Sequence, residues 1–423
     1  MEITIPDNVR ATHVYMPGKT QHGKSTLMFW MLLQDITRGN GACLMDGKGD
    51  FAPEFLNWIP ENRKDDAIYL DIDTPVPLDF MGYHGEREKE VVIAELRYIL
   101  TRSVETQYAP LMNANITDLL YTLFNYNENS KTPPHCRATF LDIFNFLDDP
   151  ERRDVILNRV TDEALQRRWR DNFPNPVERS RITTRMTSFV RSETLSKIFG
   201  TKQPRLNLAE IMDKRKILIV NLGPIDDIKK TYGTLLLSKI RQAAMRRAAI
   251  PKSQRVPFYL YCDEFQEFQT SDFDKLLSLA GGLGLCLTLA HQYTDQLESN
   301  VLSAILGNVS TFICFRLGQP SANCLRGEIP KDYLPCLTTL PVGQVVYRAA
   351  DGSTTTLHTP VPPTFPHASY AEIIRNRTVD NYGCNTSPVC STKEDGNRTP
   401  PSDEIKPTGP PNVPSHGGKK KDA

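Results

Sequence analysis

Apolar residues recur along the chain in two patterns that predict different elements. Short apolar runs bounded by polar or turn-forming residues predict strands at 11–16, 41–46, 67–72, 216–222, 258–263, 285–292 and 310–317. Several of these runs are apolar throughout, which is typical of strands covered on both faces. Residues 25–36 and 231–247 instead carry apolar side chains at helical spacing. Strands that alternate with helices predict an α/β fold with a doubly wound, mainly parallel sheet.

A long central segment lacks glycine. None of the 24 glycines lies between Glu86 and Phe199, and apolar residues recur there at helical spacing. Asp149, Pro150 and Glu151 have the residue types of a helix N-terminus. We therefore predict six or more short helices in an inserted all-α domain over 86–200.

The C-terminal part of the chain has two further features. Two runs of strand-forming residues, 343–349 and 353–359, are separated by a turn that contains Asp351 and Gly352, which predicts a hairpin. From Pro360 on, the chain holds 11 of its 31 prolines and few aliphatic residues, and it ends in three consecutive lysines, 419–421. We predict that 361–423 is a proline-rich tail, disordered from about Ser369.

Composition and charge narrow the possible partners. The 423 residues include 50 Lys+Arg and 50 Asp+Glu, so no net charge draws the whole molecule to a polyanion, and a site for one must be local. The longest uncharged apolar stretch, Leu276–Ala290, is shorter than the roughly 18 residues that cross a bilayer. The N-terminus does not resemble a signal peptide, and the nine cysteines form no CxxC pair. We expect a cytoplasmic protein without direct membrane insertion.

The most specific motif lies between the first predicted strand and the first predicted helix. It satisfies the phosphate-loop pattern GxxxxGK[ST] in both spelling and position. Glycines let the backbone N–H groups face phosphates, the lysine reaches the terminal phosphates, and the serine hydroxyl binds Mg²⁺. The motif predicts a nucleotide site formed by Gly18, Lys19, Thr20, Gln21, His22, Gly23, Lys24 and Ser25.

An acidic pair follows a later strand. Asp263 and Glu264 end the apolar run 258–263. Next to a phosphate loop, the first carboxylate can hold Mg²⁺ and the second can polarise a water molecule. The pair therefore favours nucleotide hydrolysis over a kinase or a small-molecule phosphotransferase.

Polar residues also end the next two strands, where a doubly wound fold forms its ligand crevice. Gln292 is placed to sense the terminal phosphate or the attacking water, and Arg316 to complete a site on a neighbouring subunit. A strand-end cap for Gln292 and a surface ion pair for Arg316 are equally compatible with the sequence.

We interpret His291 as structural. The stretch 151–191 holds ten arginines and six acids, and we favour a solvated helical face with internal ion pairs over a phosphate-binding surface.

The order of these motifs resembles a known family. HVYMPGKTQHGKST, LMDGKGDF, LYCDEFQEF, LAHQYTDQL and GNVSTFICFRLG are similar to the motifs of the FtsK–HerA branch of ring-forming ATPases, with the type IV secretion coupling proteins of bacterial conjugation as the closest group. The likeness covers roughly 8–360. Two features differ: we expect none of the membrane-spanning helices that usually begin coupling proteins, and Gly47 stands where relatives usually have proline.

The resemblance implies functions for individual residues. It places Lys24, Ser25 and Thr26 at ATP, and Ser25 and Asp263 at Mg²⁺. It makes Glu264 the general base, Gln292 the sensor and Arg316 a finger that acts across a hexamer interface. It divides the chain into a P-loop ATPase core of the RecA type at 1–85 and 201–360, the helical insert at 86–200 and the tail at 361–423.

The implied function is an ATP-driven hexameric translocase that moves DNA through a central pore. A relaxase or a secretion-channel protein would be the partner, and it would recruit the chain to the membrane. Two alternatives stay open: an ATPase that recruits a protein cargo through the insert, and a soluble DNA-repair or genome-packaging motor. The sequence does not indicate whether the DNA is single- or double-stranded, or in which direction it moves.

Overall fold

The computed structural model describes residues 5–74, 76–101, 109–223, 226–268, 273–361, 364 and 368–383. All of them lie within a single compact unit, residues 1–385.

One sheet organises this unit. Its strands are β1 Val14–Pro17, β2 Gly41–Asp46, β3 Ala67–Asp71, β4 Ile217–Asn221, β5 Phe258–Asp263, β6 Leu285–His291, β7 Thr311–Cys314, β8 Gln344–Arg348 and β9 Thr354–His358. They lie in the order β3-β4-β2-β5-β6-β1-β7-β8-β9. The first seven in this order are parallel, whereas β8 and β9 form an antiparallel hairpin beside β7. The predicted α/β class, each predicted strand and the hairpin are confirmed.

The two faces of the sheet explain the uninterrupted apolar strands. Leu260 and Cys262 of β5 belong to one hydrophobic cluster, and Tyr259 and Tyr261 of the same strand belong to the other. Because successive side chains point to opposite faces, a strand that is covered on both faces has no polar position to alternate with.

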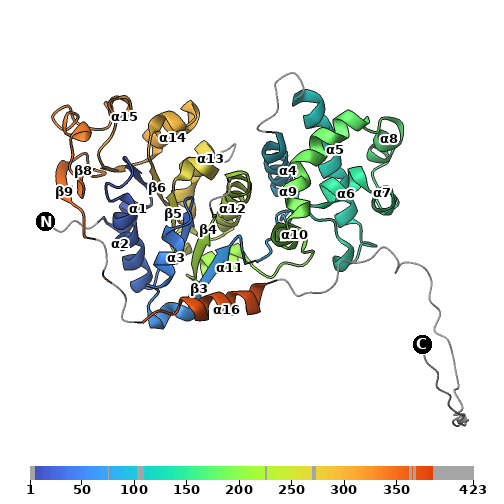
Figure 1. Cartoon of the computed structure of the whole chain (residues 1–423), viewed down its shortest axis with the longest axis horizontal. Coiled ribbons are helices and arrows are strands. Elements are labelled where there is room, and N and C mark those ends of the chain that lie inside the picture. The colour runs from blue at the N-terminus through green and yellow to red at the C-terminus, as the bar shows by residue number, and fades with distance from the viewer. Residues whose placement is uncertain are drawn as a thin grey trace, which may run out of the picture. The chain divides into compact units, whose positions relative to one another are not determined.

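Helices supply the two covering layers. The first layer contains α2 Lys24–Thr37 and α3 Phe51–Leu56, whose buried apolar residues belong to one cluster, and the short helix α1 Asp7–Arg10 precedes β1. The second contains α11 Leu208–Asp213, α12 Asp226–Arg246, α13 Phe273–Ala280 and α14 Ser299–Asn308 (Figure 1). A short helix, α15 Gln319–Cys324, follows β7.

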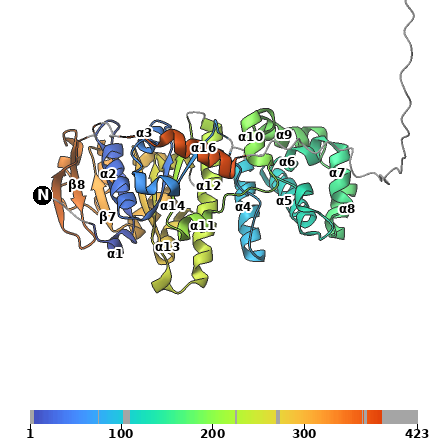
Figure 2. The same cartoon turned by 90° about the horizontal axis from the view of Figure 1, so that it is seen from below.

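The described residues between Glu86 and Gly200 contain helices and no strand. The α-helices are α4 Glu86–Thr101, α5 Ala109–Glu128, α6 Asp142–Asp148, α7 Pro150–Leu157, α8 Glu163–Asp171, α9 Pro176–Arg191 and α10 Glu193–Gly200. Figure 2 shows α5 to α10 gathered in one group next to α4. A separate domain with these bounds stays a prediction, because the residues belong to the same compact unit as the sheet.

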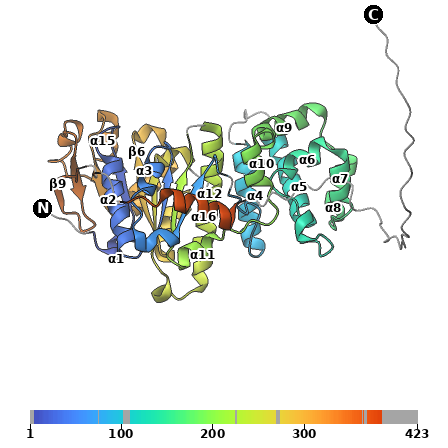
Figure 3. The same cartoon turned by 60° about the horizontal axis from the view of Figure 1, so that its bottom comes forward.

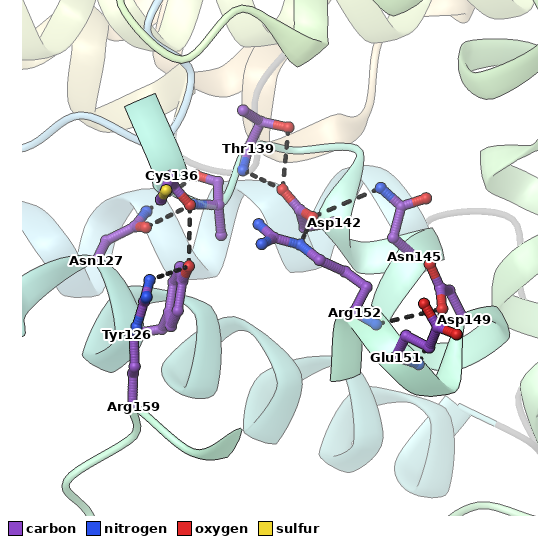
Figure 4. Close-up of polar contacts among 11 residues, drawn as sticks. Tyr126, Asn127, Cys136, Thr139, Asp142, Asn145, Asp149, Glu151, Arg152 and Arg159 are labelled. Atoms are coloured by element: carbon purple, nitrogen blue, oxygen red, sulfur yellow. Dashed lines mark hydrogen bonds and ion pairs between the residues drawn. The ribbon is translucent and has the colours of Figure 1, made fainter. Parts of the chain in front are cut away.

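Polar contacts fix the start of α7 (Figure 4). The Asp149 side chain accepts hydrogen bonds from the backbone N–H groups of Glu151 and Arg152, at 3.0 and 3.2 Å, as predicted for an N-cap. Arg152 Nε donates to Asp142 Oδ1 at 2.8 Å, and the Thr139 backbone N–H donates to the other oxygen of that carboxylate at 2.7 Å. Arg152, an arginine of the 151–191 stretch, therefore contacts a residue of the preceding helix α6.

Other arginines of that stretch are also used internally. Arg168 pairs with Asp118 at 2.8 Å, and the Arg153 guanidinium lies 4.4 Å from the centre of the Phe173 ring. The acids that pair with Arg152 and Arg168 lie outside the stretch, at Asp142 and Asp118. The interpretation of 151–191 as a solvated helical face stays a prediction.

Buried and half-buried ion pairs connect the helical segment to the core. Arg241 of α12 donates to Glu95 of α4 at 2.7 Å, and Arg246 donates to Glu88 at 2.6 Å. A cavity of about 720 Å³ lies beside this contact, lined in part by Tyr83 and by other residues of 78–84, 137–140 and 199–209. None of the predicted site residues lines it.

The C-terminal region contains an ordered helix that the sequence analysis missed. Residues Ala371–Tyr382 form α16, which lies along the edge strand β3 (Figure 3). Ile374 is fully buried, and the Tyr69 backbone N–H of β3 donates to Thr378 Oγ1 at 3.1 Å. The helix thereby covers an otherwise open sheet edge. The prediction of disorder from Ser369 is therefore wrong for 369–383, and 384–423 lie outside the described residues.

Replacing Ile374 by alanine is expected to lower the free energy of unfolding by about 2–4 kcal/mol, because it leaves a cavity between α16 and the sheet. Its neighbour Ile373 is 53% exposed and gives the matched control, for which alanine should change stability by at most about 0.5 kcal/mol. Urea unfolding of both variants checks this. Equal, small effects would mean that α16 is not part of the folded core.

In the described part of the chain, no helix combines the length and the apolar content needed to cross a bilayer.

Candidate functional site: a phosphate loop among strand ends

The phosphate loop joins β1 to α2 and is held by the two strands on either side of β1. The Gly18 backbone N–H donates to the carbonyl oxygen of His291 at 3.1 Å, and the Lys19 N–H donates to that of Arg316 at 2.8 Å. Lys24 Nζ donates to the carbonyl oxygens of Gly18 and Lys19, at 2.5 and 3.1 Å. The lysine ammonium therefore lies over the loop, at the N-terminus of α2, where phosphates bind in such loops.

The structure explains why two positions of the motif, 18 and 23, are glycine. A Cβ atom at Gly18 would lie 2.3 Å from Cβ of Phe315, so the loop could not pack against the end of β7 with any other residue there. Gly23 has a φ of 103°, in the left-handed region that favours glycine. These positions keep the loop backbone free to turn toward phosphates.

Asp263 and Ser25 meet beside the loop. Ser25 Oγ donates to Asp263 Oδ2 at 3.1 Å. The second oxygen, Asp263 Oδ1, is buried and accepts no hydrogen bond from the described residues. Burial raises the pKa of Asp263 to about 6, against the opposing charge of Lys48. A buried carboxylate oxygen without a donor, next to a hydroxyl, fits Mg²⁺, which prefers hard oxygen ligands.

Glu264 is fixed by its backbone and by three donors. Its φ of 54° is unusual for a residue with a side chain. Lys48 Nζ lies 2.7 Å from Glu264 Oε1, Gln292 Nε2 donates to the same oxygen at 2.8 Å, and Gln266 Nε2 donates to Oε2 at 2.8 Å. Burial alone would raise the pKa of Glu264, but these hydrogen bonds outweigh it and hold the pKa below its usual value.

Gln292 connects the acidic pair to the loop. Its amide nitrogen donates to Glu264, and its amide oxygen accepts a hydrogen bond from Thr20 Oγ1 at 2.9 Å. One side chain therefore touches both the phosphate loop and the carboxylate. The sheet order produces this contact, because β6 lies directly between β1 and β5.

His291 and Arg316 are placed differently. His291 is fully buried, stacks on the Tyr15 ring and is hydrogen-bonded to its hydroxyl. Burial lowers the pKa of His291 to about 4, so the ring is neutral at pH 7. The Arg316 side chain is exposed, and its Nε donates to the carbonyl oxygen of Thr338 at 3.0 Å. The structure thus brings Ser25, Asp263, Glu264 and Gln292 together, whereas the Arg316 guanidinium contacts Thr338.

Lys48 was not among the predicted site residues, although its motif was noted. It follows β2, which pairs with β5 so that Asp46 lies opposite Asp263. The charges of Asp263 and Glu264 raise the pKa of Lys48 against the effect of burial, so the side chain is a cation. The signal in the sequence was LMDGKGD, whose lysine follows the end of a predicted strand.

Comparisons with known proteins identify related folds. Residues 257–324 match a family model described as the TraM recognition site of TraD and TraG. Among solved structures, the chain is similar to the bacterial conjugative coupling protein TrwBdeltaN70, with 13% identity, a TM-score of 0.60, and coverage of 86% of this chain and 88% of that chain. TrwB in complex with ADP and Mg²⁺ gives 14% identity and a TM-score of 0.60 over 88% of this chain and 91% of that chain.

VirB4 of Thermoanaerobacter pseudethanolicus is also similar, with 12% identity, a TM-score of 0.51, and coverage of 83% of this chain and 90% of that chain. No curated protein matches the sequence. At these identities the matches show the fold, which the chain shares with the conjugative coupling protein TrwB. The resemblance read from the motifs is confirmed at that level.

Proposed function

We propose that the chain hydrolyses ATP with Mg²⁺ and uses the energy to move DNA as a ring of subunits. The observation that carries the proposal is the meeting of Ser25, Asp263, Glu264 and Gln292 at the phosphate loop. TrwB, whose fold the chain shares, has been solved with ADP and Mg²⁺, and this supports the same ligands here.

In this proposal the loop binds the nucleotide phosphates through backbone N–H groups and through Lys24. Burial lowers the pKa of Lys24, opposed by the charges of Glu264 and Asp263, and phosphates would add negative charge that favours its protonated form. Mg²⁺, held by the Ser25 hydroxyl and the Asp263 carboxylate, would neutralise charge on the terminal phosphates.

Glu264 is the group that accepts the proton of the attacking water. Its carboxylate is ionised and its position is fixed by the three donors around it. Gln292, which also contacts Thr20, orients the attacking water or senses the terminal phosphate. These roles assign one task to each polar group at the strand ends.

Two observations support a ring of subunits and DNA as the substrate. The exposed Arg316, at the end of β7, is available to a site on a neighbouring subunit. The shared fold with a bacterial conjugative coupling protein favours DNA as the substrate, of either strandedness, with a relaxase or a secretion-channel protein as partner.

One observation favours a second function. The family model that matches 257–324 is named for recognition of TraM, which fits an ATPase that recruits a protein cargo. The two functions differ in what accelerates turnover. The test is ATP turnover by the full chain without and with DNA, with Lys24→Ala as the background control: a wild type that does not exceed this control would refute the hydrolase.

A further inference from the structure

Lys48 is connected to the acidic pair more closely than its place in the sequence indicates. Its ammonium lies 2.7 Å from Glu264 Oε1, and the side chain is 30% exposed whereas that of Glu264 is 4% exposed. An ion pair at a largely buried carboxylate is stronger and more directional than one on the surface. This contact therefore fixes where the carboxylate lies.

The turn that carries Lys48 is itself rigid. Asp46 Oδ1 accepts hydrogen bonds from the backbone N–H groups of Lys48 and Gly49, at 2.9 and 3.0 Å, and Asp46 Oδ2 accepts one from Ala52 at 2.8 Å. Asp46 is completely buried at the end of β2. A carboxylate that accepts three backbone donors holds the turn in one conformation.

Gly47 brings this turn against the acidic pair. Its backbone N–H donates to the carbonyl oxygen of Asp263 at 3.3 Å, and a Cβ atom built on it would lie 2.9 Å from that oxygen. A proline at this position would have no N–H for this bond. The glycine allows the turn to approach Asp263 and Glu264 directly, and it sets the reach of Lys48.

We propose that Lys48 is a positioning residue for Glu264: it holds the carboxylate, together with Gln292, in the orientation in which Glu264 accepts a proton from water. The expected loss of turnover rests on the proposed ATP hydrolysis, whereas the expected displacement of the Glu264 carboxylate does not. The left-handed backbone of Glu264 directs the side chain, and Lys48 fixes the carboxylate at its end.

Removing the ammonium is expected to slow chemistry without weakening nucleotide binding. In Lys48→Ala the carboxylate is no longer held on the Lys48 side, and a displacement of about 1 Å at a reacting group can cost about 10²-fold in rate. Lys48→Arg keeps a cation and should restore most of the turnover number. In a Glu264→Gln background, Lys48→Ala should have no further effect, because the group that Lys48 positions is already inactive.

The experiment measures the ATP turnover number, the affinity for a non-hydrolysable ATP analogue, and the crystallographic position of the Glu264 carboxylate in each variant. Lys214→Ala is the matched control, since Lys214 pairs with Glu210 at 2.6 Å on an exposed helix face and should be silent. If Lys48→Ala does not fold, Lys48→Met retains the aliphatic part of the side chain.

The proposal is supported if turnover falls, affinity stays within about twofold, arginine restores activity and the carboxylate moves away from Gln292. It is overturned if affinity falls while turnover is kept, which would place Lys48 on the nucleotide, or if the carboxylate keeps its wild-type contacts. A wild-type chain without ATP turnover would refute the proposed function instead, and the position of Glu264 in the two structures would still decide the inference.

Discussion

Glu264→Gln is expected to bind ATP and Mg²⁺ with wild-type affinity and to turn ATP over about 10²–10⁴-fold more slowly. Glutamine keeps the size of the side chain and can still contact Gln266 and Gln292, but it cannot accept a proton from water. The chain should therefore accumulate in an ATP-bound state. Single-turnover kinetics with equilibrium binding of ATP separate the two effects.

Glu267 provides the matched control, because it lies three residues later and pairs with Lys229 and Lys230 at 3.8 Å. Glu267→Gln should hydrolyse ATP at the wild-type rate. Wild-type turnover in Glu264→Gln would show that another group activates the water, and it would remove the role assigned to Glu264.

Arg316→Ala is expected to lower turnover by about 10³–10⁵-fold, the range found for arginines that stabilise charge on a phosphoryl group in transfer. Its guanidinium is exposed and bonded to Thr338 rather than to the loop of its own subunit. We therefore expect it to act on a nucleotide bound next door. Arg316→Ala and Lys24→Ala subunits, each inactive alone, should recover part of the activity when mixed, because some interfaces then combine an intact loop with an intact arginine.

The control for this experiment is Arg326→Ala. Arg326 is another exposed arginine, and its guanidinium donates to Asn323. This variant should leave turnover unchanged. Native mass spectrometry verifies that mixed rings form. If they form and every mixing ratio stays inactive, Arg316 does not act across an interface. If Arg316→Ala alone is fully active, it has no catalytic role and the hexamer loses its main support.

The strands and the loop could be predicted because their signals are local. A continuous apolar run reports burial on both faces, and the phosphate loop needs particular residues at fixed spacing. One general rule, that ligands bind at the carboxyl ends of parallel strands, was enough to place Gln292 in the ligand crevice. Its contacts with Glu264 and Thr20 were seen only in the structure.

The two features that the sequence analysis missed, α16 and the position of Lys48, depend on contacts between residues that are distant in the sequence. α16 lies in a proline-rich region whose average composition is that of a disordered chain. Its contact with β3 is made by a few residues: the Tyr69 backbone N–H donates to Thr378, the Arg375 guanidinium lies 4.6 Å from the centre of the Tyr69 ring, and Arg377 donates to the Ala67 carbonyl oxygen at 3.1 Å. The position of Lys48 depends on the register that sets Asp46 opposite Asp263. The sequence of either strand alone does not contain that register.

The central claim is that DNA drives ATP turnover, and the most direct measurement is the ATPase rate of the full chain without DNA, with single-stranded DNA and with duplex, across a salt series. We expect at least one form of DNA to raise the turnover number above both the DNA-free rate and the Lys24→Ala background. The concentration of DNA that is needed should rise steeply with salt, because the association constant for duplex falls with a log–log slope of about −0.9 per neutralised phosphate. A turnover number that is the same with and without either form of DNA at low salt would contradict the account and favour an ATPase that serves a protein cargo.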